Sequence, residues 1–240
     1  MTARTMKALA LALLAVSLLY AASPVVRDLY HRPVRSVRIA GEFEHVTRED
    51  LRAAIRESLR AGFFAIDVAA VRRAARKLAW VRDVTVQRVW PDSLNIVVTE
   101  RQAVARWNED ALLENDASVF RPRENIDNDT HTQLRGPAGQ QAYMLDQYKR
   151  LATTFGTLAG GIRRLSLSPQ GQWQIVFGNG MTLVPGTDLE VGALRDFARA
   201  MPRVLGADLA RVVRIDLRYA NGFAVRWRKP AVPGAEGSKG

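Results

Sequence analysis

Side chains that could perform catalysis are scarce in this sequence. Its 240 residues contain no cysteine and only three histidines, His31, His45 and His131. A catalytic triad needs a base next to its nucleophile, and these histidines are scattered through segments that predict linkers and loops. Without cysteine there is no disulfide, thiolate metal site or cysteine nucleophile. We therefore expect a protein that is not an enzyme, with no catalytic residue, cofactor or metal.

Two short motifs resemble ligand sites but fit plain loops better. The cluster Asp127-Asn128-Asp129-Thr130-His131 offers oxygen ligands, yet it lacks the glycine and the terminal glutamate of an EF-hand loop. Gly178-Asn179-Gly180 resembles part of a phosphate loop, but no G-x-x-x-x-G-K follows and both flanks alternate as strands. We interpret the first motif as a solvated loop and the second as a hairpin turn.

The sequence is basic, with 35 Lys and Arg against 24 Asp and Glu and a net charge of +11. One predicted helix carries Arg72, Arg73, Arg76 and Lys77 on its polar face, where they could contact phosphates of nucleic acid or lipid, although a solvated face is the favoured interpretation. The excess charge is spread along the whole chain. This spread indicates an anionic membrane surface and acidic partners, and no nucleic acid.

The N-terminal segment predicts a membrane anchor. After Arg4 and Lys7, residues 8–26 carry no charge, and a helix of that length spans ~28 Å, close to a hydrocarbon core of ~30 Å. A cleaved signal peptide is the competing interpretation, but a cut after Ala22 would put Tyr20 at the −3 position. We favour a transmembrane helix that follows a short cytoplasmic tail at residues 1–7. Either interpretation exports the rest of the chain.

Residues 33–101 predict one small domain. A short strand ends at Gly41, a helix begins at a capping box formed by Thr47 and Asp50, and a second helix begins at Asp67. Two alternating strands follow, joined by a turn at Pro91-Asp92. The expected order is strand, helix, helix, strand, strand.

Residues 102–228 predict a β-rich domain with two inserted helices, which makes the whole chain α+β. We expect short strands at 103–107, 111–113 and 118–120, a polar loop at 121–129, a helix from Tyr143 to Gly156, and another capped by Asp188 that runs to Met201. Two hairpins turn at Asn179-Gly180 and Asn221-Gly222, pairs that suit type I′ turns. Residues 229–240 hold few apolar side chains and predict a disordered tail.

The last predicted strand, Phe223–Trp227, is followed only by this tail. Such a strand can lie at a sheet edge and accept a partner's strand, with Tyr219 and Trp227 as aromatic anchors. Alternatively, the hairpin closes the domain's own sheet and both aromatics are internal. The residues alone leave both interpretations open.

Two blocks of sequence resemble the FtsQ/DivIB family of bacterial cell-division proteins. The first lies at the junction of the two predicted domains and the second is the C-terminal hairpin. The strand, helix, helix, strand, strand unit is similar to a POTRA domain. The blocks read Trp80-Val81-Arg82-Asp83-Val84-Thr85-Val86, Trp90-Pro91-Asp92, Glu100 and Ala105-Arg106-Trp107-Asn108, then Ile215-Asp216-Leu217-Arg218-Tyr219, Asn221-Gly222, Ala224-Val225 and Trp227.

The resemblance implies a single-pass inner-membrane scaffold of the divisome, with its bulk in the periplasm at the division septum. It implies that the chain contacts inner-membrane lipid, arrives downstream of FtsK and brings the FtsB–FtsL pair, with a strand of FtsB adding to the last hairpin. At one further position where members of the family carry a basic residue, this chain has Gln170. The family's partner-binding positions correspond to Arg218, Tyr219, Asn221, Gly222 and Trp227.

On the POTRA side, the resemblance links the second strand to upstream recruitment, through Val86, Arg88 and Glu100. A periplasmic POTRA module that assists outer-membrane protein assembly is the alternative function. Repeated POTRA units and a membrane barrel are absent from the sequence, which weakens that alternative.

Overall fold

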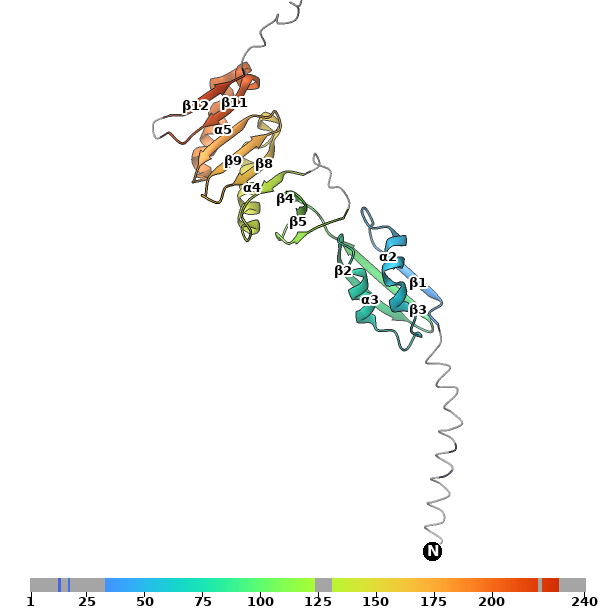
Figure 1. Ribbon diagram of the computed structural model, residues 1–240. Helices are drawn as coiled ribbons and strands as arrows, with labels where there is room; N and C mark the ends of the chain where they lie inside the picture. Colours follow the sequence, from blue (N-terminus) through green and yellow to red (C-terminus); the bar gives the residue numbers. More distant parts are fainter. Residues whose placement is uncertain (1–12, 14–16, 18–32, 124–130, 220–221, 229–240) are drawn as a thin grey trace, which may run out of the picture. The chain divides into compact units, whose positions relative to one another are not determined.

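A computed structural model describes residues 13, 17, 33–123, 131–219 and 222–228, which have an α+β architecture. The chain divides into two compact units between Arg101 and Gln102 (Figure 1). The predicted segments 1–7 and 229–240, and the predicted span 8–26 apart from the helical Leu13 and Ser17, lie outside the described residues. Within the described ranges, no helix has the length and apolar character needed to cross a membrane.

The first unit has the predicted element order. A three-stranded sheet of order β1-β3-β2 pairs β1 parallel and β2 antiparallel to β3. Two helices pack on one face, where Leu51, Ile55, Val71 and Ala75 meet the apolar side chains of β2 and β3. The elements are β1 (Ser36–Ala40), α2 (Arg48–Ile55), α3 (Val68–Ala75), β2 (Val81–Val89) and β3 (Ser93–Glu100).

Both predicted helix caps of this unit are confirmed. The backbone N–H of Asp50 donates to Oγ1 of Thr47 at 3.1 Å, and the Asp50 carboxylate accepts from the N–H of Thr47. Oδ1 of Asp67 accepts from the N–H of Ala69 at 2.8 Å. The first helix is shorter than its apolar pattern predicts, because the chain continues from Arg56 to Leu59 as a 3₁₀ helix.

The second unit is built on a nine-stranded mixed sheet of order β12-β11-β10-β9-β8-β7-β4-β5-β6. Two 15-residue helices, α4 (Gln141–Phe155) and α5 (Val191–Leu205), contribute Met144, Leu151 and Leu194 to its core. The strands are β4 (Ala105–Trp107), β5 (Ala111–Leu113), β6 (Val119–Phe120), β7 (Gln133–Arg135), β8 (Ile162–Leu167), β9 (Trp173–Phe177), β10 (Thr182–Gly186), β11 (Val212–Asp216) and β12 (Ala224–Trp227).

One aligned row of apolar side chains crosses this sheet. Each member is the register partner of the next, from β4 to β12. All are buried except the last, which is half-buried and packs against the same core. Because side chains alternate between faces, this row fixes which face of each strand points inward. We call it the apolar row; it consists of Trp107, Leu134, Leu165, Ile175, Leu183, Ile215 and Val225.

Two predicted details of the second unit are wrong, and strands β7 and β8 were not predicted. The turn at Asn179-Gly180 is not type I′, because only Gly180 has a positive φ, of 85°. The loop instead includes Gly178, whose N–H bonds to the oxygen of Gly161, so contacts with a neighbouring segment determine the turn. The helix predicted to be capped by Asp188 has Glu190 at its N-cap, without a side-chain capping bond.

We predict that Leu183→Ala lowers the free energy of unfolding of the second unit by about 2–5 kcal/mol, since it removes a fully buried member of the apolar row. Urea unfolding followed through the fluorescence of the buried Trp107 and Trp173 measures this change. The control Val204→Ala, at a side chain 67% exposed on α5, should change the free energy by about 0.5 kcal/mol or less. Equal effects of the two substitutions would show that the row is not the core.

Candidate partner-binding edge

Strand β12 lies at one end of the nine-stranded order, and β11 is its only neighbour among the described strands. The N–H of Arg228 donates to the oxygen of Arg211 at 2.7 Å, so this residue turns its main chain toward β11. Successive residues of an antiparallel strand turn their N–H and C=O groups to opposite sides. The main-chain groups of Val225 and Trp227 therefore point outward, away from β11.

Large aromatic side chains flank this edge and are exposed. Tyr219 is 60% exposed, Phe223 50% and Trp227 43%. Phe223 packs edge-to-face on Phe197 of α5, with ring centroids 6.2 Å apart. The alternative in which Tyr219 and Trp227 are internal is therefore wrong, because both rings are exposed and β12 is the last strand of the sheet among the described residues.

Arg218 makes a bidentate ion pair within its own chain. Its Nε and one terminal nitrogen lie 2.8 and 2.7 Å from the two carboxylate oxygens of Asp216, and its backbone N–H lies 3.2 Å from the first of them. These bonds hold the pKa of Asp216 at about 2, below its ordinary value of 3.8, and burial opposes them only in part. Arg214 adds a weaker contact at 3.5 Å.

The Asp216–Arg218 ion pair holds the chain where the turn between β11 and β12 begins. The N–H of Leu217 donates to the oxygen of Val184, which ties the end of β11 to β10. The aliphatic part of the Arg218 side chain lies beside Gly186, where an added Cβ would sit 3.5 Å from it. The Arg218 side chain is still 44% exposed, so a partner carboxylate can reach it without displacing Asp216.

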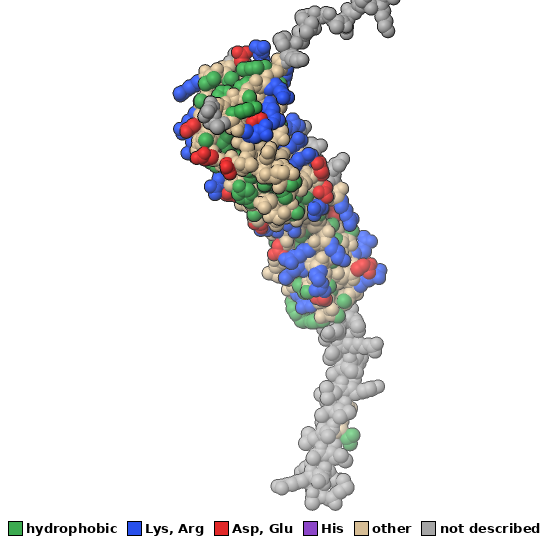
Figure 2. Space-filling model, turned by 60° about the vertical axis from the view of Figure 1, so that its left-hand side comes forward, with side chains coloured by type: hydrophobic (Ala, Val, Ile, Leu, Met, Phe, Trp, Pro, Cys, Tyr) green, Lys and Arg blue, Asp and Glu red, His purple; other side chains and the backbone are tan. Residues whose placement is uncertain are grey.

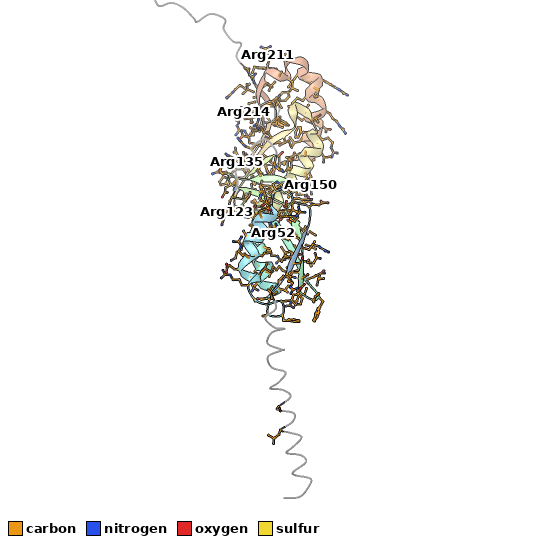
Figure 3. The ribbon with its side chains drawn as sticks, turned by 90° about the vertical axis from the view of Figure 1, so that its right-hand side faces the viewer. Arg52, Arg123, Arg135, Arg150, Arg211 and Arg214 are labelled. Atoms are coloured by element: carbon orange, nitrogen blue, oxygen red, sulfur yellow. The ribbon has the colours of Figure 1, made fainter. Side chains whose placement is uncertain are left out.

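The sheet face opposite the apolar row carries polar and basic side chains. The sequence analysis did not predict this surface. A cavity of about 550 Å³ opens on it, lined by residues that include Arg135, Ser166, Gln174 and Arg214. Figure 3 shows Arg135 and Arg214 on the same side of this unit. The sequence contains a pattern that predicts this surface, since each of these residues is the direct neighbour of a member of the apolar row. Gln170 lies in the exposed turn before Gln172, which lines the same cavity.

The other candidates in the hairpin are only partly described. Gly222 is exposed, and its N–H lies 3.5 Å from the oxygen of Tyr219. Asn221 lies outside the described residues, as do most members of the acidic cluster that begins at Asp127. Within the described ranges, no group of three or more His, Asp or Glu side chains is arranged to hold a metal ion.

Of the three candidate binding residues in the first unit, Val86 and Glu100 stabilise the fold. Val86 is 7% exposed and belongs to the core. The Glu100 side chain is 9% exposed, and its carboxylate accepts three backbone N–H bonds from residues 44–46, the closest from Val46 at 2.9 Å. Arg88 is exposed, and its guanidinium donates to the oxygen of Ile66 at 2.6 Å. Of the three, only Arg88 offers its side chain to a partner.

Comparison with known proteins divides the chain at the same place as its structure. Residues 32–101 match the family model of the FtsQ-type POTRA domain, and residues 105–218 match that of the C-terminal part of cell division protein FtsQ/DivIB. The cell division protein FtsQ of Neisseria meningitidis serogroup B is 30% identical over 93% of this chain and 95% of its own length. That of Xanthomonas campestris is 32% identical over 82% of this chain and 70% of its own length. That of Coxiella burnetii is 28% identical over 91% of this chain and 90% of its own length.

We predict that Asp216→Asn lowers the free energy of unfolding at neutral pH by about 1–2 kcal/mol. The lowered pKa of Asp216 means that its ionised form stabilises the fold above pH about 4, and this contribution is lost as the pH falls from about 4 to about 2. Each pKa unit corresponds to about 1.4 kcal/mol, and we discount the total because Arg218 is partly exposed to solvent. Urea unfolding at several pH values measures the change.

Asp208→Asn is the matched control. The side chains of Asp208 and its partner Arg211 are 59% and 58% exposed, and such surface pairs contribute little. The control should keep the pH dependence of the parent between pH 4 and 2, whereas Asp216→Asn should flatten it. A parallel loss of stability with falling pH in both variants would contradict the assignment to Asp216.

Proposed function

This chain belongs to the FtsQ/DivIB family of cell division proteins, and from this premise we propose that it is a non-enzymatic scaffold of the divisome. Residues 8–26 anchor it in the inner membrane, and its two folded units lie in the periplasm at the septum. It recruits the FtsB–FtsL pair by taking a strand of FtsB onto the edge of β12. The observation that carries this proposal is the outward side of β12, which pairs with no other strand among the described residues.

Strand addition suits the geometry of this edge. The outward N–H and C=O groups of Val225 and Trp227 are the groups that an added strand would bond, and backbone bonds supply much of the affinity in this mode. Tyr219 and Trp227 border the edge and can cover the apolar side chains of an added strand. Aromatic anchors of this kind bury a large area at a small cost in conformational entropy.

Charge around the edge selects an acidic partner. Arg214 and Arg226 are register partners on β11 and β12, and Arg218 follows two residues after β11. Asp216 is the acidic member of this group, and it is already bonded to Arg218. A carboxylate on the incoming segment would therefore meet a net positive surface, and a guanidinium can hold such a carboxylate in a charge-assisted bond.

We expect Tyr219→Glu and Trp227→Glu each to abolish binding of the FtsB–FtsL pair while the second unit stays folded. Both side chains are exposed, so the substitutions leave the core intact, but a carboxylate would repel an acidic partner and remove an anchor. A pull-down of the pair with the full chain in detergent measures binding. Val204→Glu, at a side chain 67% exposed on α5, is the control and should bind as the parent does. Unchanged binding by both edge variants would refute the assignment.

Hydrogen exchange tests the mode of binding separately. If FtsB adds a strand, the outward N–H groups of Val225 and Trp227 should gain protection when the pair binds, while that of Arg226, already turned toward β11, should change little. Protection confined to α4 or α5 would instead indicate that the partner docks on the helices.

The first unit carries the second part of the proposal, the link to upstream recruitment by FtsK. We predict that Arg88→Glu lowers septal localisation of a fluorescent fusion, because it reverses the charge of the exposed candidate on β2. Gln87→Glu is the matched control, since it adds an acidic side chain at the adjacent exposed position and should leave localisation unchanged. Normal septal rings with the Arg88 variant would remove this residue from the recruitment surface.

A further inference from the structure

The first unit ends in an exposed apolar surface that its own core does not use. Trp90, in the turn between β2 and β3, is 69% exposed, and Val89, the last residue of β2, is 47% exposed. Phe64, from the loop between the helices, packs against the Trp90 ring with centroids 5.7 Å apart. We call Phe64, Val89, Trp90 and Pro91 the apolar tip. Figure 2 shows hydrophobic side chains gathered at this end of the first unit.

This tip lies where the chain enters the first unit. The N–H of Arg35 donates to the oxygen of Asp92 at 2.9 Å, and Ser36 is the register partner of Ser93. The first residues of the unit therefore lie beside the turn that carries Trp90.

Little chain separates the tip from the predicted anchor. Residues 27–33 follow the uncharged run of residues 8–26, and seven residues span at most ~25 Å when fully extended. The start of the first unit, and with it the apolar tip, is thus tethered close to the end of the span.

The charges beside the tip match a membrane surface. The three segments that form this end, residues 33–35, 60–66 and 88–92, contain Arg35, Arg60 and Arg88 but a single acidic residue, Asp92. The side chains of Arg35 and Arg60 are 80% and 76% exposed and form surface ion pairs with Asp92 at 3.5 Å and with Glu57 at 3.2 Å. Exposed pairs of this kind contribute little, so both guanidiniums can exchange these partners for lipid phosphates. Arginine near an anionic leaflet is attracted to its lipid headgroups, and Trp is enriched at the boundary between hydrocarbon and water.

We propose that the apolar tip inserts into the interfacial layer of the membrane, with Trp90 among the upper acyl chains and Arg35 and Arg60 at anionic headgroups. The proposal rests on the anchoring of residues 8–26 that the proposed function includes. It gives the first unit a second point of attachment, which limits its rotation about the anchor. A protein partner on the same surface is the competing occupant, and a vesicle that contains only lipid and this chain excludes it.

Fluorescence quenching tests the insertion directly. The chain has five tryptophans, Trp80, Trp90, Trp107, Trp173 and Trp227, and none lies in residues 8–26. The full chain is reconstituted into vesicles of phosphatidylethanolamine and phosphatidylglycerol whose acyl chains are brominated close to the headgroup. Bromine quenches only tryptophans that reach it, so the parent chain should be quenched and Trp90→Phe should lose most of that quenching.

Trp227→Phe is the matched control. It removes another partly exposed tryptophan, from the second unit, and should leave the quenching as in the parent. Phenylalanine at position 90 keeps an aromatic ring against Phe64, and a circular dichroism spectrum like that of the parent shows that the fold is kept. Equal quenching in Trp90→Phe and the parent, or no quenching in either, would overturn the proposal.

Alkaline extraction of the same vesicles separates this proposal from the function on which it rests. Retention of the parent chain in the membrane supports the anchor. If the chain is retained and Trp90 is not quenched, the tip proposal fails and the anchor stands. If extraction removes the chain, both fail.

Discussion

The alignment of the apolar row is the constraint on which the second unit depends. Seven strands place one apolar side chain each in register, and a shift of one residue in any strand would turn its inward side chains to the other face. At β12 the row ends with Val225, half-buried against the same core. The core therefore holds one side of the last strand and leaves the outward hydrogen-bonding groups of Val225 and Trp227 exposed. The packing of the core thus holds β12 in place with β11 as its only neighbour among the described strands.

The ion pair of Asp216 and Arg218 supports this edge at its turn. Two parallel bonds hold a guanidinium and a carboxylate at the end of β11, and a bidentate pair of this kind fixes orientation as well as distance. A lone buried carboxylate at this place would carry a desolvation cost, and Arg218 offsets it. Asp216 is thus already neutralised by Arg218, and in the proposed binding mode an acidic partner would meet the remaining positive charge of Arg214 and Arg226.

Local signals in the sequence predicted most elements of the fold but not the details that depend on distant contacts. The caps at Thr47 and Asp67 involve neighbouring residues, so the sequence showed them directly. Strand β8 was missed because a register shift between Ile162 and Arg164 breaks its alternation, and β7 was missed because Leu134 is its only apolar residue. The edge aromatics were identified, but whether they lie inside or outside depends on the strand order. Glu100 is a charged residue, which by itself predicts a surface position. Its bonds to the N–H groups of residues 44–46 depend on contacts between distant parts of the chain, so the sequence did not predict them.

Each unit leaves one group of large apolar side chains exposed where its own packing ends. At β12 the unsatisfied groups include backbone N–H and C=O, which water can solvate but which a second strand satisfies with fixed geometry. At the apolar tip, Val89 ends β2 as the register partner of Ser93, and Trp90 follows in the turn beyond that ladder. β2 is also the last strand of its sheet in the order β1-β3-β2, but the turn that carries Trp90 lies beyond the paired residues, and its apolar area can be buried in lipid. The same basic, cysteine-free chain can thus present two surfaces of different character, because β12 offers a hydrogen-bonding edge flanked by aromatic side chains, whereas the apolar tip offers an exposed tryptophan beside exposed arginines.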